Sequence, residues 1–216
     1  NLNTKNILRM KTQRYLIKVC GMTQGDNIRE IEALGVDLIG FNFYPKSPRC
    51  LSQMPDYLPQ QARCVGVFVN QPKEEVTMYA DRFGLDYLQL HGTESPGYCR
   101  TLQAAGFHLI KVFSIARAKD LERIHEYEGL CEYFLFDTKT PRYGGSGEQF
   151  DWSLLRHYHG RTPFLLGGGI NAYSAKAIHA LRHPQLAGVD LNSRFELSPG
   201  IKDAERVRNF IKELNG

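Results

Sequence analysis

The chain is 216 residues long, with 42% hydrophobic and 23% charged residues and a formal net charge of +4 at pH 7. This balance is typical of a globular protein and excludes the disordered and fibrous classes. The 27 Lys and Arg are scattered among 23 Asp and Glu, so we expect no nucleic-acid partner. A local cluster of positive charge could still bind a small phosphate or carboxylate.

Signals for membranes, export and crosslinks are absent from the sequence. No stretch of about 18 apolar residues occurs, so we expect no membrane partner and a cytoplasmic protein. Residues 1–13 are predicted to be a polar, flexible N-terminal extension, and residues 14–216 a single catalytic domain. The five cysteines are odd in number and form no C-x-x-C pair, which predicts reduced thiols and no metal site.

Eight short β-rich runs recur along the chain, with helical spacings of apolar residues between them. The runs are residues 15–20, 36–43, 63–69, 86–91, 108–113, 133–137, 163–168 and 187–192. They are apolar almost throughout, as expected for parallel strands covered on both faces. Eight strand–helix units without a linker predict an α/β fold, a single-domain TIM (β/α)8 barrel, in preference to an open doubly wound sheet.

Residues that begin and end helices support this alternation. Thr23 resembles the cap of the first helix, while Asn171 and Asp203 are expected to cap the last two. Pro59 cannot continue an ordinary helix, so the second helix should be short, displaced or broken. The helix after the sixth strand, around "FDWSLLRHY", is also predicted to be short.

Function in such a barrel is expected where the strands end, at their carboxyl ends. Gly168 and Gly169 follow the seventh run, and Asn192 and Ser193 follow the eighth. In this position, backbone N–H groups commonly bind phosphate, although a triple glycine alone also fits a plain turn. We therefore predict a phosphate site between these two loops.

Four further side chains in this ring could carry chemistry, and each also has a purely structural interpretation. Cys20 shares one side of its strand with Lys18, which could stabilise a thiolate, but a cysteine here is more often a small buried hydrophobe. Asp137 closes an apolar strand and is as well explained by a solvated acid or helix cap as by catalysis. Arg49 could bind a carboxylate bidentately, and His91 could orient a ligand.

Seven motifs in order resemble those of the phosphoribosylanthranilate isomerase family of tryptophan biosynthesis. They are "KVCGMT", "GFNFYPKSPRCLS", "GVFVN", "QLHG", "DTKTPRYGGSGEQFDW", "GGIN" and "GVDLNSRFELSPGIKD". The resemblance covers residues 15–214. No single motif is decisive, but their order on successive strands makes the combination specific, and it implies the same eightfold barrel.

The resemblance implies an Amadori rearrangement of N-(5-phosphoribosyl)anthranilate to 1-(2-carboxyphenylamino)-1-deoxyribulose 5-phosphate, without cofactor or metal. By similarity Cys20 would be the general base and Asp137 the general acid; Lys18 and His91, from their own positions, could support them. Arg49 would hold the anthranilate carboxylate, and Asp190 would lie near the substrate amine or sugar hydroxyls. The phosphate would be held by Gly168, Gly169, Asn192 and Ser193. Members of this family often carry a small residue where this chain has Arg194.

Two other functions stay open at this stage. A histidine-pathway isomerase performs the same rearrangement on a doubly phosphorylated substrate. Such enzymes use two carboxylates, with an aspartate where Cys20 stands here. They also have a second phosphate site, but no glycine-rich turn that could form one follows the third run of this chain. A noncatalytic barrel could bind a sugar phosphate without needing both Cys20 and Asp137. The sequence leaves a monomer and a homodimer equally open.

Overall fold

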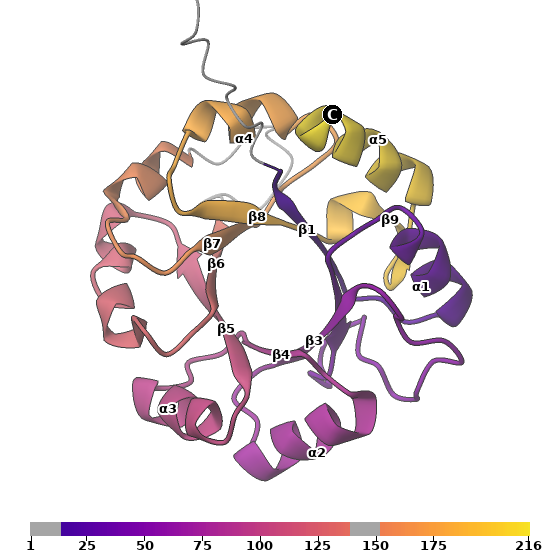
Figure 1. Ribbon diagram of the computed structural model, residues 1–216, viewed down its shortest axis with the longest axis horizontal. Helices are drawn as coiled ribbons and strands as arrows, with labels where there is room; N and C mark the ends of the chain where they lie inside the picture. Colours follow the sequence, from indigo (N-terminus) through magenta and orange to yellow (C-terminus); the bar gives the residue numbers. More distant parts are fainter. Residues whose placement is uncertain (1–13, 139–151) are drawn as a thin grey trace, which may run out of the picture.

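The barrel consists of eight parallel strands that close in chain order. The computed structural model describes residues 14–138 and 152–216, so the expected extension at residues 1–13 lies outside the described residues. The strands are β1 (Leu16–Cys20), β2 (Leu38–Asn42), β3 (Arg63–Phe68), β4 (Tyr87–Leu90), β5 (His108–Ile115), β6 (Tyr133–Thr138), β7 (Phe164–Gly167) and β8 (Leu186–Leu191). β8 pairs with β1 and closes the ring (Figure 1). The predicted TIM barrel is confirmed, and the open sheet is excluded.

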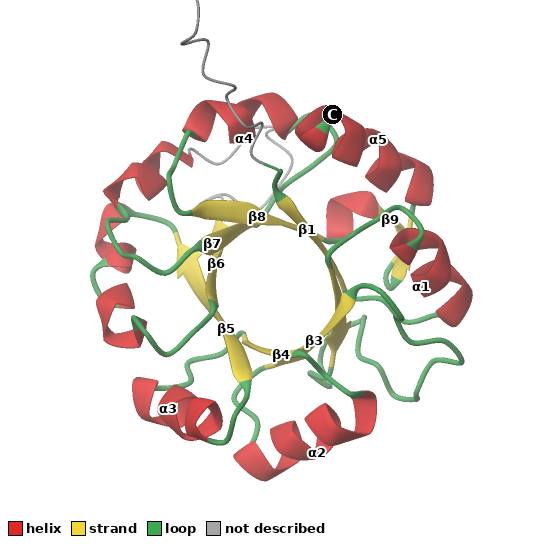
Figure 2. Cartoon of the chain, in the orientation of Figure 1, coloured by secondary structure: helices red, strands yellow, loops and turns green. Residues whose placement is uncertain are grey.

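Helices surround the strands on the outside (Figure 2). They are α1 (Gly25–Glu32), α2 (Lys73–Phe83), α3 (Pro96–Ala104), α4 (Ala175–Leu181) and α5 (Ala204–Asn215). Shorter 3₁₀ segments are η1 (Ala118–Leu121), η2 (Ile124–Tyr127), η3 (Trp152–His157) and η4 (Ser193–Phe195), and a hairpin of β9 (Glu196–Ser198) and β10 (Ile201–Lys202) precedes α5. The short helix expected around "FDWSLLRHY" is η3. Within the described residues no helix is long and apolar enough to cross a membrane.

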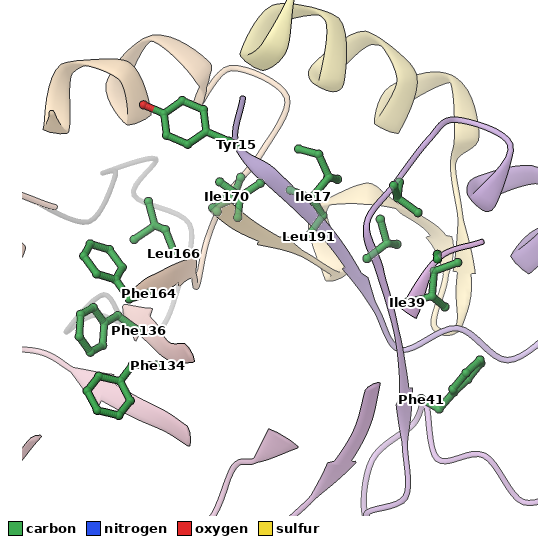
Figure 3. Close-up of a cluster of buried hydrophobic side chains, with 14 of the residues drawn as sticks. Tyr15, Ile17, Ile39, Phe41, Phe134, Phe136, Phe164, Leu166, Ile170 and Leu191 are labelled. Carbon is green, nitrogen blue, oxygen red and sulfur yellow. The ribbon is translucent and has the colours of Figure 1, made fainter. Parts of the chain in front are cut away.

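Side chains alternate between two buried layers along each strand. Ile17, Ile39 and Phe136 point outwards into the layer beneath the helices, where they are fully buried (Figure 3). A second cluster fills the barrel and includes Leu38, Val65, Ile110, Leu135 and Leu165. Both faces of the sheet are therefore apolar near the strand starts, which leaves the carboxyl ends for polar side chains.

The structure corrects two of the three predicted helix caps. Thr23 does not cap α1, because its hydroxyl donates instead to the carbonyl of Gly200, 3.1 Å away. Asn171 lies too early to cap α4, which begins at Ala175; its side-chain oxygen accepts from the amide of Tyr173 in a local turn. The third prediction is confirmed, since Asp203 accepts from the amide of Arg206 at the start of α5.

The segment between β2 and β3 contains no helix, and the buried carboxylate of Glu32 organises it instead. One Glu32 oxygen accepts from the backbone amides of residues 60, 61 and 62, and the other accepts from the Tyr57 hydroxyl. Burial alone would raise the pKa of Glu32, but these hydrogen bonds outweigh it and lower the pKa. The second helix was expected to be short, displaced or broken at Pro59, but the segment forms no helix at all, and the end of α1 fixes the path of the chain.

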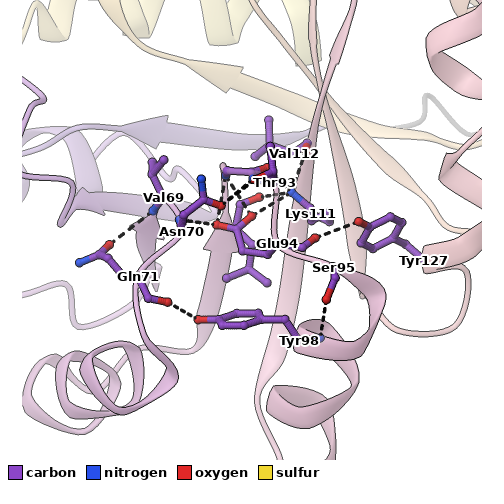
Figure 4. A network of polar contacts seen from close by, with 12 residues as sticks. Val69, Asn70, Gln71, Thr93, Glu94, Ser95, Tyr98, Lys111, Val112 and Tyr127 are labelled. Atoms are coloured by element: carbon purple, nitrogen blue, oxygen red, sulfur yellow. Dashed lines mark hydrogen bonds and ion pairs between the residues drawn. The ribbon is translucent and has the colours of Figure 1, made fainter.

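A buried ion pair joins the loops that follow β3 and β4 to β5 (Figure 4). Lys111 on β5 places its Nζ 3.1 Å from Glu94 Oε2 and also donates to the carbonyls of Leu90 and Gly92. Glu94 in turn accepts from the amides of Asn70 and Gly92. The carbonyls of Leu90 and Gly92 flank His91, so the ion pair fixes the backbone from which His91 projects.

Candidate active site

The carboxyl ends of β1, β6 and β8 bring three titratable side chains to the inner side of one barrel rim. Cys20 is the last residue of β1, and Asp137 and Asp190 are the last but one of β6 and β8. Asp137 lies two residues after Leu135, which belongs to the cluster that fills the barrel, so the alternation turns its side chain inwards. Cys20 and Asp137 were expected on one rim from their positions at strand ends, and the closed barrel brings them there.

Lys18 lies below Cys20 on the inner face of β1 and forms an ion pair with β8. Its Nζ is 2.7 Å from Asp190 Oδ1, and the lysine side chain is fully buried while that of Asp190 is 11% exposed. Burial would lower the pKa of Lys18, but the charges of Asp190 and of a Cys20 thiolate outweigh it and raise the pKa. Lys18 therefore stays a cation at neutral pH.

Cys20 is buried, with 4% of its surface exposed. Burial raises the pKa of its thiol, Lys18 and Lys202 act in the opposite direction, and the pKa remains above its ordinary value. The expected help from Lys18 is thus present but is outweighed by burial. At neutral pH the thiol form predominates in the free protein, and thiolate forms as the pH rises.

His91 and Asp137 face each other across the rim. His91 follows β4, and its Nε2 lies 3.7 Å from Asp137 Oδ2. The two side chains are 38% and 24% exposed, so both are open to a ligand that enters from the carboxyl ends of the strands.

Arg49 does not stand free in its loop, as a solvated arginine would. Its Nε and Nη2 donate to the two carboxylate oxygens of Glu196 on β9 at 2.8 and 2.6 Å, in a bidentate pair. Glu196 also accepts from Nζ of the buried Lys202 on β10. Burial by itself would raise the pKa of Glu196, but the bonds from Arg49 and Lys202 lower it to about 2.

The two loops predicted to hold phosphate lie beside each other after β7 and β8. Gly168 and Gly169 both have left-handed backbones, with φ of 75° and 72°, and a Cβ on Gly169 would meet no atom within 4 Å. Asn192 directly precedes the short helix η4, and Ser193 is its first residue. Arg194 is exposed at this rim, and its carbonyl accepts from the Arg206 guanidinium.

Sequence reasoning missed Glu196 and Lys202, because both lie in a hairpin beyond the last barrel strand. The only available signal was that Arg49 would need an anionic partner if its side chain were partly buried. Gln89 on β4 is also buried, with 1% of its surface exposed. Among the described residues no partner is recorded for its side-chain oxygen.

A separate cavity of about 750 Å³ lies at the opposite end of the barrel, near the starts of β5, β6 and β7. His108, Glu132 and Arg161 are among its lining residues. The polar residues brought together by the strand ends lie elsewhere, and we therefore place the candidate site at the carboxyl ends. Over residues 14–138 and 152–216, no three His, Cys, Asp or Glu side chains are arranged to hold a metal ion.

Comparison with known proteins identifies the family. The sequence pattern of the family described as PRAI, N-(5'phosphoribosyl)anthranilate (PRA) isomerase, matches residues 17–213. The chain belongs to this family. Among curated relatives, the N-(5'-phosphoribosyl)anthranilate isomerase of Phocaeicola vulgatus is 51% identical over 199 residues, which cover 92% of this chain and 97% of that protein. The chain is therefore an isomerase.

Solved structures of phosphoribosylanthranilate isomerases have the same fold. The Thermotoga maritima enzyme superposes with a TM-score of 0.79 at 35% identity, covering 93% of this chain and 98% of that one. A second structure, at a TM-score of 0.77 and 31% identity with the same coverage, is a complex with reduced 1-(o-carboxyphenylamino)-1-deoxyribulose 5-phosphate. That ligand carries both a carboxylate and a phosphate.

Proposed function

We propose that this isomerase catalyses the Amadori rearrangement of N-(5'-phosphoribosyl)anthranilate in tryptophan biosynthesis, with Cys20 as general base and Asp137 as general acid. The observation that carries the assignment is that a thiol and a carboxylate end β1 and β6 on the inner side of the same rim. Two strands, β7 and β8, separate them in the ring. A substrate lying across the barrel mouth would therefore have one group on each side.

The reaction divides into two proton transfers. Asp137 donates a proton to the ribose ring oxygen as the C1–O bond breaks, and the anthranilate nitrogen forms a protonated Schiff base with C1. The Cys20 thiolate then removes the proton from C2, which gives an enolamine that tautomerises to the ketone. Neither transfer calls for a cofactor, and general acid–base catalysis of this kind contributes about 10²- to 10⁴-fold per group.

Charge around the rim matches the two ends of this substrate. Glu196 occupies the edge of the Arg49 guanidinium that Nε and Nη2 form. The second edge, which includes Nη1, suits the anthranilate carboxylate. Gly168, Gly169, Asn192 and Ser193 would hold the phosphate through backbone N–H groups. Asp190, held by Lys18, would face the substrate amine or sugar hydroxyls, and His91 would support Asp137.

The proposal is tested by supplying phosphoribosylanthranilate and following the loss of anthranilate fluorescence. Cys20→Ala and Asp137→Asn should each lower kcat by at least about 10²-fold, because each removes a proton-transfer group. Two variants serve as matched controls: Cys131→Ala removes a thiol at the opposite end of the barrel, and Asp81→Asn an exposed carboxylate on α2. Both should turn over like the parent protein.

Near-normal turnover in Cys20→Ala or Asp137→Asn would refute the assigned roles. Conversion of the histidine-pathway substrate alone, in a parallel assay, would replace the function with that of the sister isomerase. Binding of the sugar phosphate without turnover by the parent protein would favour a noncatalytic barrel. The related Thermotoga maritima enzyme is described as dimeric, and light scattering on this protein would distinguish the monomer from the homodimer.

A further inference from the structure

Glu196 lies between two cations at the rim, and the proposed function gives it no contact with either the carboxylate or the phosphate of the substrate. Its side chain is 5% exposed and contacts Arg49 on one side and the fully buried Lys202 on the other. Resting on the proposed function, we propose that Glu196, held by Lys202, is a positioning residue that aims Arg49 and so sets the preference of this site for ligands with a carboxylate. Glu196 acts through Arg49 and does not touch the substrate.

The geometry of the Arg49 pair explains how an acid can help bind another acid. A guanidinium has five N–H donors in a rigid plane, and Glu196 takes the edge formed by Nε and Nη2. The remaining edge, formed by Nη1 and the second Nη2 hydrogen, can bind one more carboxylate bidentately. Because the guanidinium is planar, fixing one edge also fixes the direction of the other.

Arg49 passes directly over the chain that follows Cys20. Gly21 has φ of 77°, and a Cβ placed on it would lie 2.6 Å from Cδ of Arg49. Arg49 and Cys20 also interact electrostatically. The pKa of Arg49 is raised mainly by its hydrogen bonds to Glu196, and Cys20 contributes a smaller part of the increase. A carboxylate held on the free edge of Arg49 would therefore lie close to the proposed base.

Lys202 anchors Glu196 and connects it to the other end of the site. Its Nζ donates to Glu196 and, at 3.0 Å, to Asn192 Oδ1 in the loop proposed to hold phosphate. Burial lowers the pKa of Lys202, Arg49 lowers it further, and Glu196 opposes both. Two cations and one carboxylate leave one net positive charge, which a ligand carboxylate would neutralise. Without Glu196, the cations would repel each other and Arg49 would lose its orientation.

The experiment measures carboxylate preference by calorimetry with two ligands. One is reduced 1-(o-carboxyphenylamino)-1-deoxyribulose 5-phosphate. The other is the same compound with a phenylamino group in place of the carboxyphenylamino group, so that it lacks the carboxylate. Glu196→Gln should weaken binding of the first ligand about tenfold or more, and of the second by less than about twofold, because only the first uses Arg49. Glu196→Asp keeps the charge but shortens the reach, so its loss should be intermediate.

A double-mutant cycle separates positioning from a direct contact. Arg49→Met should abolish the preference for the carboxylate, and adding Glu196→Gln to Arg49→Met should change the ratio of the two affinities no further. Glu205→Gln, an exposed acid in the first turn of α5, is the matched control and should leave both affinities unchanged.

The inference is overturned if Glu196→Gln keeps the affinity ratio of the parent protein, or if both ligands weaken equally. Thermal unfolding confirms that each variant is folded; should Glu196→Gln not fold, Glu196→Asp carries the same test. Failure of the proposed function has a different signature, because the parent protein would then not convert phosphoribosylanthranilate. Normal conversion by the parent with an unchanged ratio in the variants refutes the positioning role alone.

Discussion

Breaking the ion pair between Glu94 and Lys111 should be among the most destabilising single changes in this barrel. The Lys111 and Glu94 side chains are 3% and 2% exposed, so neither charge has access to water. Glu94→Gln keeps the shape of the side chain but removes the carboxylate that pairs with the Lys111 ammonium, which then keeps neutral partners only, among them three backbone carbonyls. Removing one partner of a buried pair costs about 3–5 kcal/mol, against a total stability of about 5–15 kcal/mol for a typical domain.

Urea unfolding followed by circular dichroism measures this loss, and the slope m shows whether the unfolding reaction itself has changed. Glu126→Gln is the matched control, because Glu126 pairs with Arg123 on the surface, where the two side chains are 41% and 84% exposed. Such an exposed pair contributes about 0–1 kcal/mol. The double variant Glu94→Met, Lys111→Met should recover much of the loss, since it removes both charges.

A large contribution from this ion pair is refuted if Glu94→Gln lowers the free energy of unfolding by less than about 1 kcal/mol, which is comparable to an exposed pair. That result would mean that the ammonium is solvated or neutral in the variant. A double variant less stable than Glu94→Gln would also refute it, because the backbone bonds of Lys111 would then outweigh its uncompensated charge.

Three further predictions concern the rim. Burial raises the pKa of Cys20, so the rate of its alkylation by iodoacetamide should still increase with pH above pH 9. Lys18→Met should shift this increase to higher pH, because Lys18 lowers the pKa of Cys20. An alkylation rate that reaches a plateau below pH 8 would contradict this. The pKa of Glu196 is lowered from 4.5 to about 2, so its contribution, up to about 3 kcal/mol, is complete above pH 4.5 and is lost as the pH falls towards 2. Urea unfolding between pH 6 and 2 should therefore show a smaller loss of unfolding free energy with falling pH in Glu196→Gln than in the parent protein. The same loss in both proteins would refute the lowered pKa. Gly21 and Gly35 both have φ of 77°, so replacing either with alanine should lower the free energy of unfolding by about 1–2 kcal/mol. Only the Cβ of Gly21→Ala would meet Arg49, so only this variant should bind the carboxylated ligand more weakly in calorimetry. Equal binding by both variants would contradict this.

The barrel itself was predictable because its signals repeat. Eight apolar runs separated by helical spacings give the same answer many times over, so one unit that lacks its helix, as between β2 and β3, does not change the fold. The inner position of Cys20 also followed from local alternation, since it lies two residues after Lys18. What alternation cannot supply is the neighbour of β1, and the pairing of Lys18 with Asp190 follows only once β8 closes the ring.

The two wrong cap predictions share one cause, and a long separation along the chain adds to it for Thr23 but not for Asn171, whose partner is two residues away. Thr23 and Asn171 were read as caps because short polar side chains favour that position, but such side chains bond to whichever backbone group is nearest. For Thr23 that group is the carbonyl of Gly200, 177 residues away along the chain. Glu196 was missed for the same reason, as its partner Arg49 lies 147 residues earlier. Contacts of this range depend on the assembled barrel and leave no local pattern.

The distribution of charge around the rim is consistent with the roles proposed for the thiol on β1 and the carboxyl group on β6. A base that must lose its proton gains from nearby cations, and Lys18 and Lys202 both act on Cys20 in that direction. An acid that must deliver a proton is better placed away from fixed cations. The ion partner of Asp137 among the described residues is His91, which is positive only when protonated. Lys18 and Lys202 thus favour ionisation of Cys20, against burial and the charge of Asp190, and two strands, β7 and β8, separate Cys20 from the proposed acid.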